Sequence, residues 1–463
     1  MTMFGSPWFG SAGAAFTIDQ SCRFTTAATS YLTWTPGDAP DSQRKFTFSY
    51  WMKRGKIDTT QQIHTESTGA TGGTAGFGLY ITSSNKLELY SSPLSLLSTT
   101  ATHTTTNDWV HVVEVIDTTQ ATDTNRLKLY VDGALVTSFV STNYPAQNAD
   151  MSITSSGVVN RIGATSGSNY PMDLYLAEFH YLDGIAAAVG DFGETVDGVW
   201  VPKEYGGSYG GHGYYMDFAD SADLGADQSG NSNDFTSSGL ASSDQMKDSP
   251  TNNFAVFDTL VANAPVANWK ELNLETAGAG WSSTRWAAMS TLIIPTDKKI
   301  YFEVNSSVNH GSYYSFGGGT ASSVPSSTLV GGTGSVTYLN AAAWVNGSEV
   351  GSYGTRIAAG EIGQCAIDGA TGKVWFGKDN TWFSSGDPAA GSSEAGTITN
   401  GGAEDLHVVV AAYGTVMLNF GQDSSFDGDE TRQNNADGDG FGDFYYAPPS
   451  GFLALCTKNG ATL

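Results

Sequence analysis

The chain has 463 residues, with 46 acidic and 21 basic side chains and a formal net charge of -25. This length allows two or three domains of ordinary size, and the negative charge excludes nucleic acid as an expected partner because phosphate backbones would be repelled. Only 14% of the residues are charged and 56 are glycine, a composition typical of many short strands joined by tight turns.

The first 13 residues are expected to form an N-terminal arm. The opening sequence "MTMFGSPWFGSAGAAFTIDQ" has no basic segment followed by an apolar run, and no stretch of 18 apolar residues occurs in the chain. We therefore expect synthesis in a cytoplasm without a signal peptide, and no membrane insertion.

Residues 14–196 are predicted to form an antiparallel β-sandwich. The segment "KFTFSYWMKRG" at 45–55 alternates Phe46, Phe48 and Tyr50 on one face with a second set of side chains on the other. The segments "DWVHVVEVID" at 108–117 and "NRLKLYVDG" at 125–133 behave alike, and the second ends in the Asp-Gly signal of a tight turn. Helical periodicity is almost absent.

Residues 197–267 are predicted to be an ordered connector. This stretch is too long and too aromatic for a plain flexible linker. Its aromatic side chains are expected to pack against one or both neighbouring domains: Trp200, Tyr205, Tyr214, Tyr215, Phe218 and Phe235.

Residues 268–463 are predicted to form a second sandwich. In "CAIDGATGKVWFG" an Asp-Gly turn is expected to set Cys365 and Ile367 opposite Val374 and Phe376 or nearby. The three cysteines are widely separated and are expected to be small core residues. The predicted fold class is therefore all-β, with two antiparallel, jelly-roll-like β-sandwich domains joined by an ordered connector.

Several motifs carry a resemblance to known families. At "FTFSYWMKRG", "DWVHVVEVIDTTQATDTNRLKLYVDG" and "LAEFHYLDG" the first block resembles the laminin-G-like or concanavalin A-like lectin fold. At "KIYFEVNSS", "GEIGQCAIDGATGKVWFGKDNTWFSSGDPAAG" and "APPSGFLALC" the second block is similar to a SPRY domain, a bent β-sandwich used for recognition. Their pairing through "DQSGNSNDFT" and "SPTNNF" resembles large virion proteins of tailed bacteriophages, particularly marine ones. This implies a virion-surface location and synthesis in a host cytoplasm.

An acidic, glycine-rich segment near the C-terminus is a candidate calcium loop. Its carboxylates supply the hard oxygen ligands that Ca²⁺ takes in sets of six to eight. The segment lacks the glutamate and the flanking helices of an EF-hand. A solvated acidic insertion between two strands is the alternative. The candidate ligands are Asp427, Asp429, Asp437, Asp439 and Asp443.

No catalytic constellation is visible in the sequence. A retaining glycosidase needs two carboxyl groups on one face, which on a strand means a spacing of two residues. Glu114 and Asp117 are three residues apart, so we expect them on opposite faces. His111 lies between valines and is expected to be a structural histidine. The chain is therefore predicted not to be an enzyme.

Sugar recognition requires exposed aromatic rings beside polar groups. Aromatic side chains in predicted turns of the second block supply candidates, and the SPRY resemblance implies a ligand surface in the same loops. The alternative is that these rings pack the sandwich or a neighbouring subunit. The candidates are Tyr313, Tyr314, Trp344, Tyr353 and Trp382.

The sequence and its resemblances leave two alternative functions of different classes. The first is non-enzymatic recognition of a host-surface glycan or receptor by a tail fibre or other phage appendage, in multiple copies so that weak sites gain avidity. The second is a structural capsid decoration or tail connector that mainly contacts other virion proteins. The expected partners are other virion proteins, a host-surface polysaccharide or receptor, and further copies of the chain. The resemblance to phage fibres implies a trimer.

Overall fold

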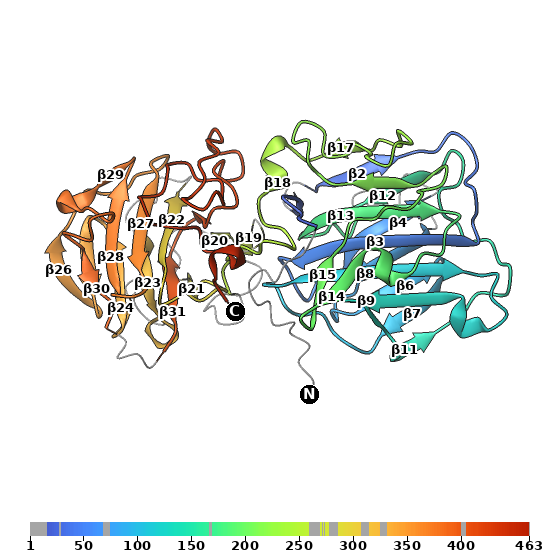
Figure 1. Cartoon of the computed structure of the whole chain (residues 1–463), viewed down its shortest axis with the longest axis horizontal. Coiled ribbons are helices and arrows are strands. Elements are labelled where there is room, and N and C mark those ends of the chain that lie inside the picture. The colour runs from blue at the N-terminus through green and yellow to red at the C-terminus, as the bar shows by residue number, and fades with distance from the viewer. Residues whose placement is uncertain are drawn as a thin grey trace. The chain divides into compact units, whose positions relative to one another are not determined.

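A computed structural model shows two compact units, the first ending at Thr251 and the second beginning at Asn252 (Figure 1). The described residues contain β-strands and short 3₁₀ turns but no α-helix, and no helix among them could span a membrane. The fold is all-β, as predicted. The structure describes residues 16–26, 29–67, 75–165, 169–258, 269–270, 272, 274–276, 286–306, 314–324, 331–399 and 404–462.

The first unit is a sandwich of two antiparallel sheets. One sheet contains β1 (Ser21–Phe24), β3 (Lys45–Arg54), β8 (Trp109–Asp117), β9 (Leu127–Val131), β10 (Ala134–Leu135), β13 (Leu174–Asp183), β16 (Tyr214–Met216) and β18 (Gln245–Met246). Its order is β10-β9-β8-β3-β13-β1-β18, with β16 also paired to β13.

The facing sheet of the first unit contains β2 (Tyr31–Trp34), β4 (Gln61–Ser67), β5 (Ala75–Ile81), β6 (Leu87–Ser91), β7 (Leu94–Thr99), β11 (Phe139–Thr142), β12 (Val159–Ile162) and β17 (Thr236–Ser238). Its order is β11-β7-β6-β5-β4-β12-β2-β17. A separate hairpin joins β14 (Gly193–Val196) and β15 (Val199–Pro202).

The strand β3 shows why the two sheets pack. Phe46 meets Phe77 of the facing sheet edge-to-face, with ring centroids 4.9 Å apart, and Phe48 stacks on His64 at 3.9 Å. On the other face of β3, Trp51 stacks on His111 at 4.6 Å. The predicted alternation is thus confirmed, and both faces of the strand are buried.

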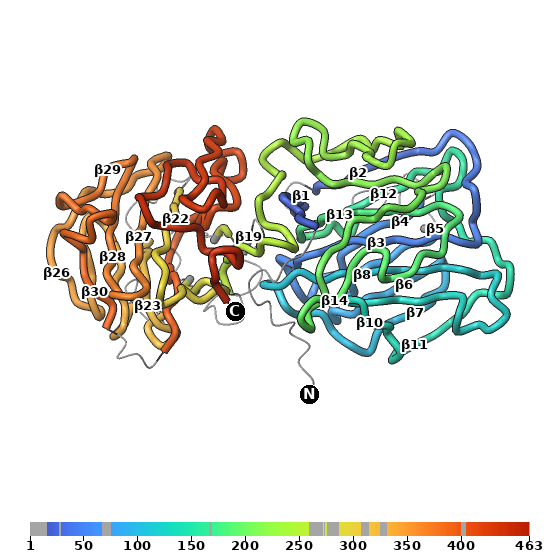
Figure 2. Tube along the Cα trace, viewed as in Figure 1, coloured from blue at the N-terminus to red at the C-terminus, as the bar shows by residue number. Residues whose placement is uncertain are grey.

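The segment expected to be a separate connector lies largely within the first unit. Its residues 214–216, 236–238 and 245–246 are β16, β17 and β18, which pair with strands of both sheets. In Figure 2 this light-green segment stays with the strands of the first unit. The division of the chain therefore differs from the expected one, because pairing with sheet edges extends the first sandwich to residue 251.

Hydrogen bonds from its own side chains hold the motif "DQSGNSNDFT" in place. Asp227 accepts hydrogen bonds from the backbone N–H groups of Tyr215, Ser229 and Asn233, at 2.8 to 2.9 Å. The side chains of Asn231 and Asn233 both donate to the Gly213 carbonyl. These bonds satisfy backbone groups that no strand pairs, as an Asx-rich loop does.

The second unit also has two antiparallel sheets. One contains β19 (Trp269–Lys270), β20 (Glu275–Thr276), β22 (Lys299–Asn305), β27 (Gly363–Asp368), β28 (Lys373–Lys378), β29 (Thr381–Trp382), β30 (Gly396–Thr397) and β32 (Val416–Asn419). Its order is β19-β20-β32-β22-β27-β28-β29, with β30 also paired to β28.

The other sheet of the second unit contains β21 (Trp286–Met289), β23 (Tyr314–Thr320), β24 (Ser335–Leu339), β25 (Ala342–Val345), β26 (Ser348–Ser352) and β31 (Leu406–Ala412). Its order is β21-β31-β23-β24-β25-β26. The N-terminal arm at 1–13 lies outside the described residues.

The predicted hairpin of the second unit is confirmed. Cys365 is the register partner of Phe376, and Ile367 that of Val374. Cys365 is fully buried, as are Cys22 and Cys456, and all three thiols are free. Burial raises the pKa of Cys456 to about 12, so its thiol stays protonated.

Candidate functional site

Tyr314 begins β23, and only 8% of its surface is exposed. Its ring stacks on Phe316 with the centroids 6.2 Å apart. Tyr314 therefore packs the interior of the second sandwich. It offers no exposed ring face, which stacking on a sugar requires. Its neighbour Tyr313 lies outside the described residues.

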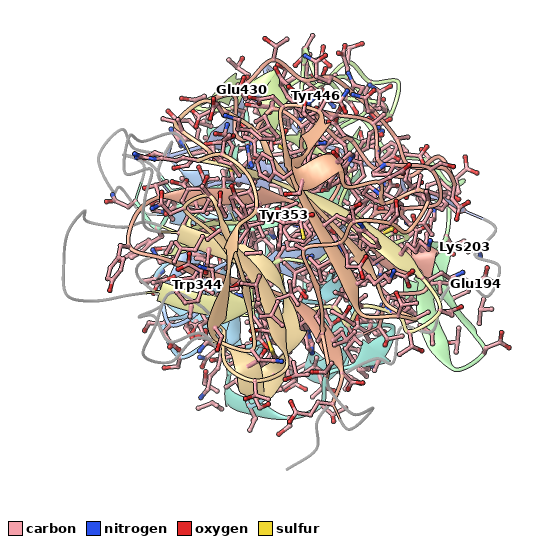
Figure 3. All side chains as sticks on the ribbon, turned by 90° about the vertical axis from the view of Figure 1, so that its left-hand side faces the viewer. Glu194, Lys203, Trp344, Tyr353, Glu430 and Tyr446 are labelled. Atoms are coloured by element: carbon pink, nitrogen blue, oxygen red, sulfur yellow. The ribbon has the colours of Figure 1, made fainter. Side chains whose placement is uncertain are left out.

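Trp344, Tyr353 and Trp382 are each partly exposed. Figure 3 labels Trp344 on β25 and Tyr353, which follows β26, at separate places on the second unit. The Tyr353 hydroxyl donates to the Ser393 carbonyl at 3.1 Å, and Trp382 packs edge-on against buried Tyr301. Their role in ligand binding stays a prediction.

Asp437 organises the acidic loop from within. Its Oδ1 accepts the backbone N–H groups of Asp439 and Phe441, both at 2.9 Å. Its Oδ2 accepts the Ala454 N–H and the Asn459 side-chain amide, both at 2.8 Å. Four donors converge on this buried carboxylate, so both of its oxygens are already used to fold the loop.

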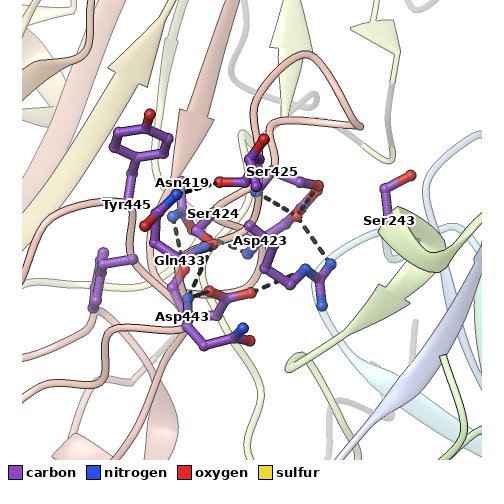
Figure 4. Close-up of polar contacts among 12 residues, drawn as sticks. Ser243, Asn419, Asp423, Ser424, Ser425, Gln433, Asp443 and Tyr445 are labelled. Carbon is purple, nitrogen blue, oxygen red and sulfur yellow. Dashed lines mark hydrogen bonds and ion pairs between the residues drawn. The ribbon is translucent and has the colours of Figure 1, made fainter.

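A second carboxylate network holds the start of the same segment (Figure 4). Asp423 accepts hydrogen bonds from the N–H groups of Ser425 and Asp427, at 2.9 and 3.0 Å. Arg432 lies between two acids, 3.1 Å from an oxygen of Asp423 and 3.4 Å from one of Asp443. Burial raises the pKa of Asp443, and the Arg432 guanidinium opposes that rise. Asp423 was not among the sequence candidates.

The five candidate calcium ligands do not form one ligand set in the described residues. Asp437 and Asp443 are buried, whereas Asp427, Asp429 and Asp439 are exposed. Within the described ranges, no group of three or more His, Cys, Asp or Glu side chains converges as a metal site requires. Calcium binding therefore stays a prediction, and the described residues contain no set of ligands that fits it.

Glu114 lies inside the first sandwich rather than in a cleft. Its carboxylate accepts the Tyr50 hydroxyl at 3.0 Å, and His64 Nε2 lies 2.9 and 3.1 Å from its two oxygens. Asp117 instead binds the backbone N–H and the hydroxyl of Thr119. The two acids thus serve different local networks and cannot act on one sugar.

His111 is a structural histidine, as expected. Trp200 Nε1–H can only donate, and it lies 3.0 Å from His111 Nδ1, so that nitrogen must accept. His111 Nε2 then carries the proton and donates to Ser49 Oγ at 2.9 Å. Burial lowers the pKa of His111 to about 3, which keeps the ring neutral.

A bulge in β13 creates an aromatic and acidic cluster that sequence reasoning missed. The register with β3 shifts after Ala177, and Glu178 has a φ of 50°. The Tyr215 hydroxyl donates to both oxygens of Glu178, at 2.9 and 2.8 Å, and its ring stacks on His180 at 4.3 Å. Tyr209 lies 3.0 Å from His180 Nδ1. A bulge breaks the alternation of faces, so the strand pattern gave no signal for it.

Residues 26–188 match the family model described as the concanavalin A-like lectin/glucanases superfamily. These residues lie in the first unit and include most strands of both its sheets. The first unit therefore has a concanavalin A-like sandwich fold. No curated protein sequence is significantly similar to the chain.

Several solved structures are similar to parts of the chain. A heptameric SAP-like pentraxin from Limulus polyphemus is 16% identical, covers 36% of this chain and 76% of its own, and has a TM-score of 0.27. The SPRY domain of human HERC1 is 14% identical, covers 35% of this chain and 96% of its own, and has a TM-score of 0.25. A sialidase from Trypanosoma rangeli is 14% identical, covers 30% of this chain and 20% of its own, and has a TM-score of 0.23.

Proposed function

We propose that this protein is a non-enzymatic carbohydrate-recognition protein on the surface of a phage particle, where it binds a host-surface glycan or receptor. The observation that carries the proposal is the match of residues 26–188 to the lectin and glucanase superfamily. The bacteriophage setting rests on the resemblance of the paired modules to phage virion proteins. Weak sites on several copies would gain affinity by avidity.

The engagement of two buried acids in the first unit, Asp183 and Asp248, supports binding rather than hydrolysis. Asp183 accepts backbone N–H groups of Asp41, Ser42 and His212. Buried Asp248 accepts Lys53 Nζ at 2.6 Å and an indole N–H at 2.9 Å. A hydrolase needs two carboxyl groups free to face one sugar, and these carboxylates are committed to internal donors.

A glycan array tests this proposal directly. The full chain would be biotinylated and displayed on streptavidin beads, so that weak sites act together, and probed against bacterial surface polysaccharides. We expect binding to a restricted set of glycans that soluble monovalent protein competes away. The absence of any bound glycan at high valency would contradict the proposal.

A structural role in a larger assembly is the second candidate, and two sheet edges favour it. β10 and β11 are edge strands, one in each sheet of the first unit, and they expose Leu135 at 46% and Val140 at 61%. Exposed apolar edges are sites where another chain can pair. Antibody labelling of intact particles would separate the two roles. A protruding position supports adhesion, and a position buried between other subunits supports assembly.

A further inference from the structure

The second unit contains a small cavity beside the carboxyl end of β22. It encloses about 160 Å³. β20, β22 and β32 form one side of it and the loop that follows β32 forms the other. Its lining residues are Glu275, Asn305, Thr415, Met417, Phe426, Asp427 and Asp429.

One lining side chain points to a ligand. Asn305 is 2% exposed, and its Oδ1 is fully buried without a hydrogen-bond partner among the described residues. Its amide nitrogen donates to Glu430 Oε1 at 3.4 Å, so the amide oxygen is the atom without a partner. A buried carbonyl oxygen without a donor carries a desolvation cost. A donor-bearing group in the cavity would remove that cost.

The charge around the cavity is negative. Glu275, Asp427 and Asp429 line it. Glu430 accepts a hydrogen bond from the lining residue Asn305. Burial raises the pKa of Glu430, and the nearby carboxylate of Asp429 raises it further. Such crowding of negative charge favours a cation. Figure 3 labels Glu430 at one end of this unit.

The size and lining of the cavity favour an organic cation over a bare metal ion. A single water needs only about 10–15 Å³ measured in the same way, so 160 Å³ admits a group as large as one sugar ring. No three acidic side chains in the described residues converge as metal ligands. Met417 and Phe426 complete the lining, and both side chains are buried.

We propose that this cavity binds a protonated amino sugar, with the ammonium group facing the acids and the Asn305 carbonyl oxygen. The proposal rests on glycan recognition as the proposed function and names the sugar class that the second unit would take. A charge-assisted hydrogen bond to a carboxylate is roughly twice as strong as a neutral one. The amine should therefore dominate selection.

Ligand-observed NMR on the full chain tests the ligand class. Glucosamine, N-acetylglucosamine, methylammonium and Ca²⁺ would each be titrated, because acetylation removes the charge and methylammonium lacks the ring. We expect glucosamine to bind at least about tenfold more tightly than the other two organic ligands, and Ca²⁺ not to displace it. Equal binding of glucosamine and N-acetylglucosamine, equal binding of methylammonium, or displacement by Ca²⁺ would each overturn the proposal.

Two exposed lining acids and one matched control locate the site. Asp427→Asn and Asp429→Asn should each weaken glucosamine binding about three- to tenfold, whereas Asp439→Asn removes the same charge from an exposed loop position outside the lining and should leave it unchanged. Equal weakening by all three variants would mean a general charge effect and contradict the site.

If the array finds neutral glycans only, glycan recognition stands and this inference fails. If glucosamine binds but no surface glycan does, the proposed function fails instead.

Discussion

Two fully buried glutamates, one from each unit, serve different purposes. Glu114 in the first unit and Glu303 in the second are both 0% exposed, and each accepts a tyrosine hydroxyl at 3.0 Å. Glu114 also contacts His64 on the facing sheet, so it joins the two sheets of its sandwich. Glu303 instead accepts the backbone N–H groups of Tyr445 and Tyr446, at 2.8 and 2.7 Å.

The difference shows how a strand-rich chain fixes segments that no sheet pairs. Residues 445–446 belong to no strand, and their N–H groups would be orphaned without the Glu303 carboxylate. The Asn419 amide completes the same set at 3.2 Å. One buried acid thus ties sheet to sheet, whereas the other ties an irregular segment to a sheet. Each carboxylate is committed to this structural task.

Replacing Glu303 by leucine should have the largest effect on this comparison. Two backbone N–H groups and the Asn419 amide would lose their acceptor inside the second unit. We expect the free energy of unfolding of that unit to fall by about 4 kcal/mol, measured by chemical denaturation. Glu303→Gln keeps one acceptor oxygen and should cost less. A loss below about 1 kcal/mol in Glu303→Leu would show that water satisfies the donors.

His64→Leu should have the next largest effect, in the first unit. The Glu114 carboxylate would keep only the Tyr50 hydroxyl, and a buried acid that loses its partner costs about 3 kcal/mol or more. The double variant His64→Leu/Glu114→Leu removes the acid as well and should recover part of that loss. If the two single losses simply add in the double variant, the contact between the two side chains contributes nothing.

Stability should fall with rising pH through Glu303. Burial raises its folded pKa from an ordinary value of about 4.5 to about 7, while the N–H donors oppose that rise. The folded state therefore binds the Glu303 proton more tightly than the unfolded state does. The contribution of this proton to the free energy of unfolding is complete below pH 4.5 and is lost as the pH rises through 7. At 1.36 kcal/mol per pKa unit this amounts to about 3 kcal/mol at most. Glu303→Gln should lack this component when both proteins are unfolded at pH 5 and pH 8, and an unchanged slope would refute it.

The smallest expected effect separates two acids of the C-terminal loop. Asp437→Ala removes the acceptor of four donors and should cost about 2 kcal/mol, whereas exposed Asp439→Ala should stay within about 0.5 kcal/mol. Thermal unfolding with and without EDTA checks both. A larger cost for Asp439→Ala, or a drop in melting temperature with EDTA, would favour the calcium loop.

The strands could be predicted because successive side chains of a β-strand point to opposite faces of the sheet, so the sequence shows an alternating pattern. Phe46 and Phe48 share one face of β3, as predicted, and Cys365 pairs with Phe376 as expected. The end of the first unit could not be predicted, since β16, β17 and β18 have only two or three residues each. So short a segment carries too few alternations to show a period. Its pairing depends on sheet edges formed far away in the sequence.

The site residues were harder to predict than the strands. Tyr314 was expected in an exposed turn, but it begins a buried strand whose glycine-rich sequence "YSFGGGT" resembles a loop. Asp437 and Asp439 look alike in the sequence, yet one is buried at 8% exposure and the other is exposed. Which acid turns inward depends on the donors of Ala454 and Asn459, which follow much later in the chain.

Recovery of the bound sugar tests the central proposal that this protein binds carbohydrate without cleaving it. The full chain would be incubated with a polysaccharide selected on the array, separated by affinity capture, and the retained sugar analysed by mass spectrometry. We predict retained sugar of unchanged length after prolonged incubation. Shortened products, or no retained sugar at all, would contradict the account.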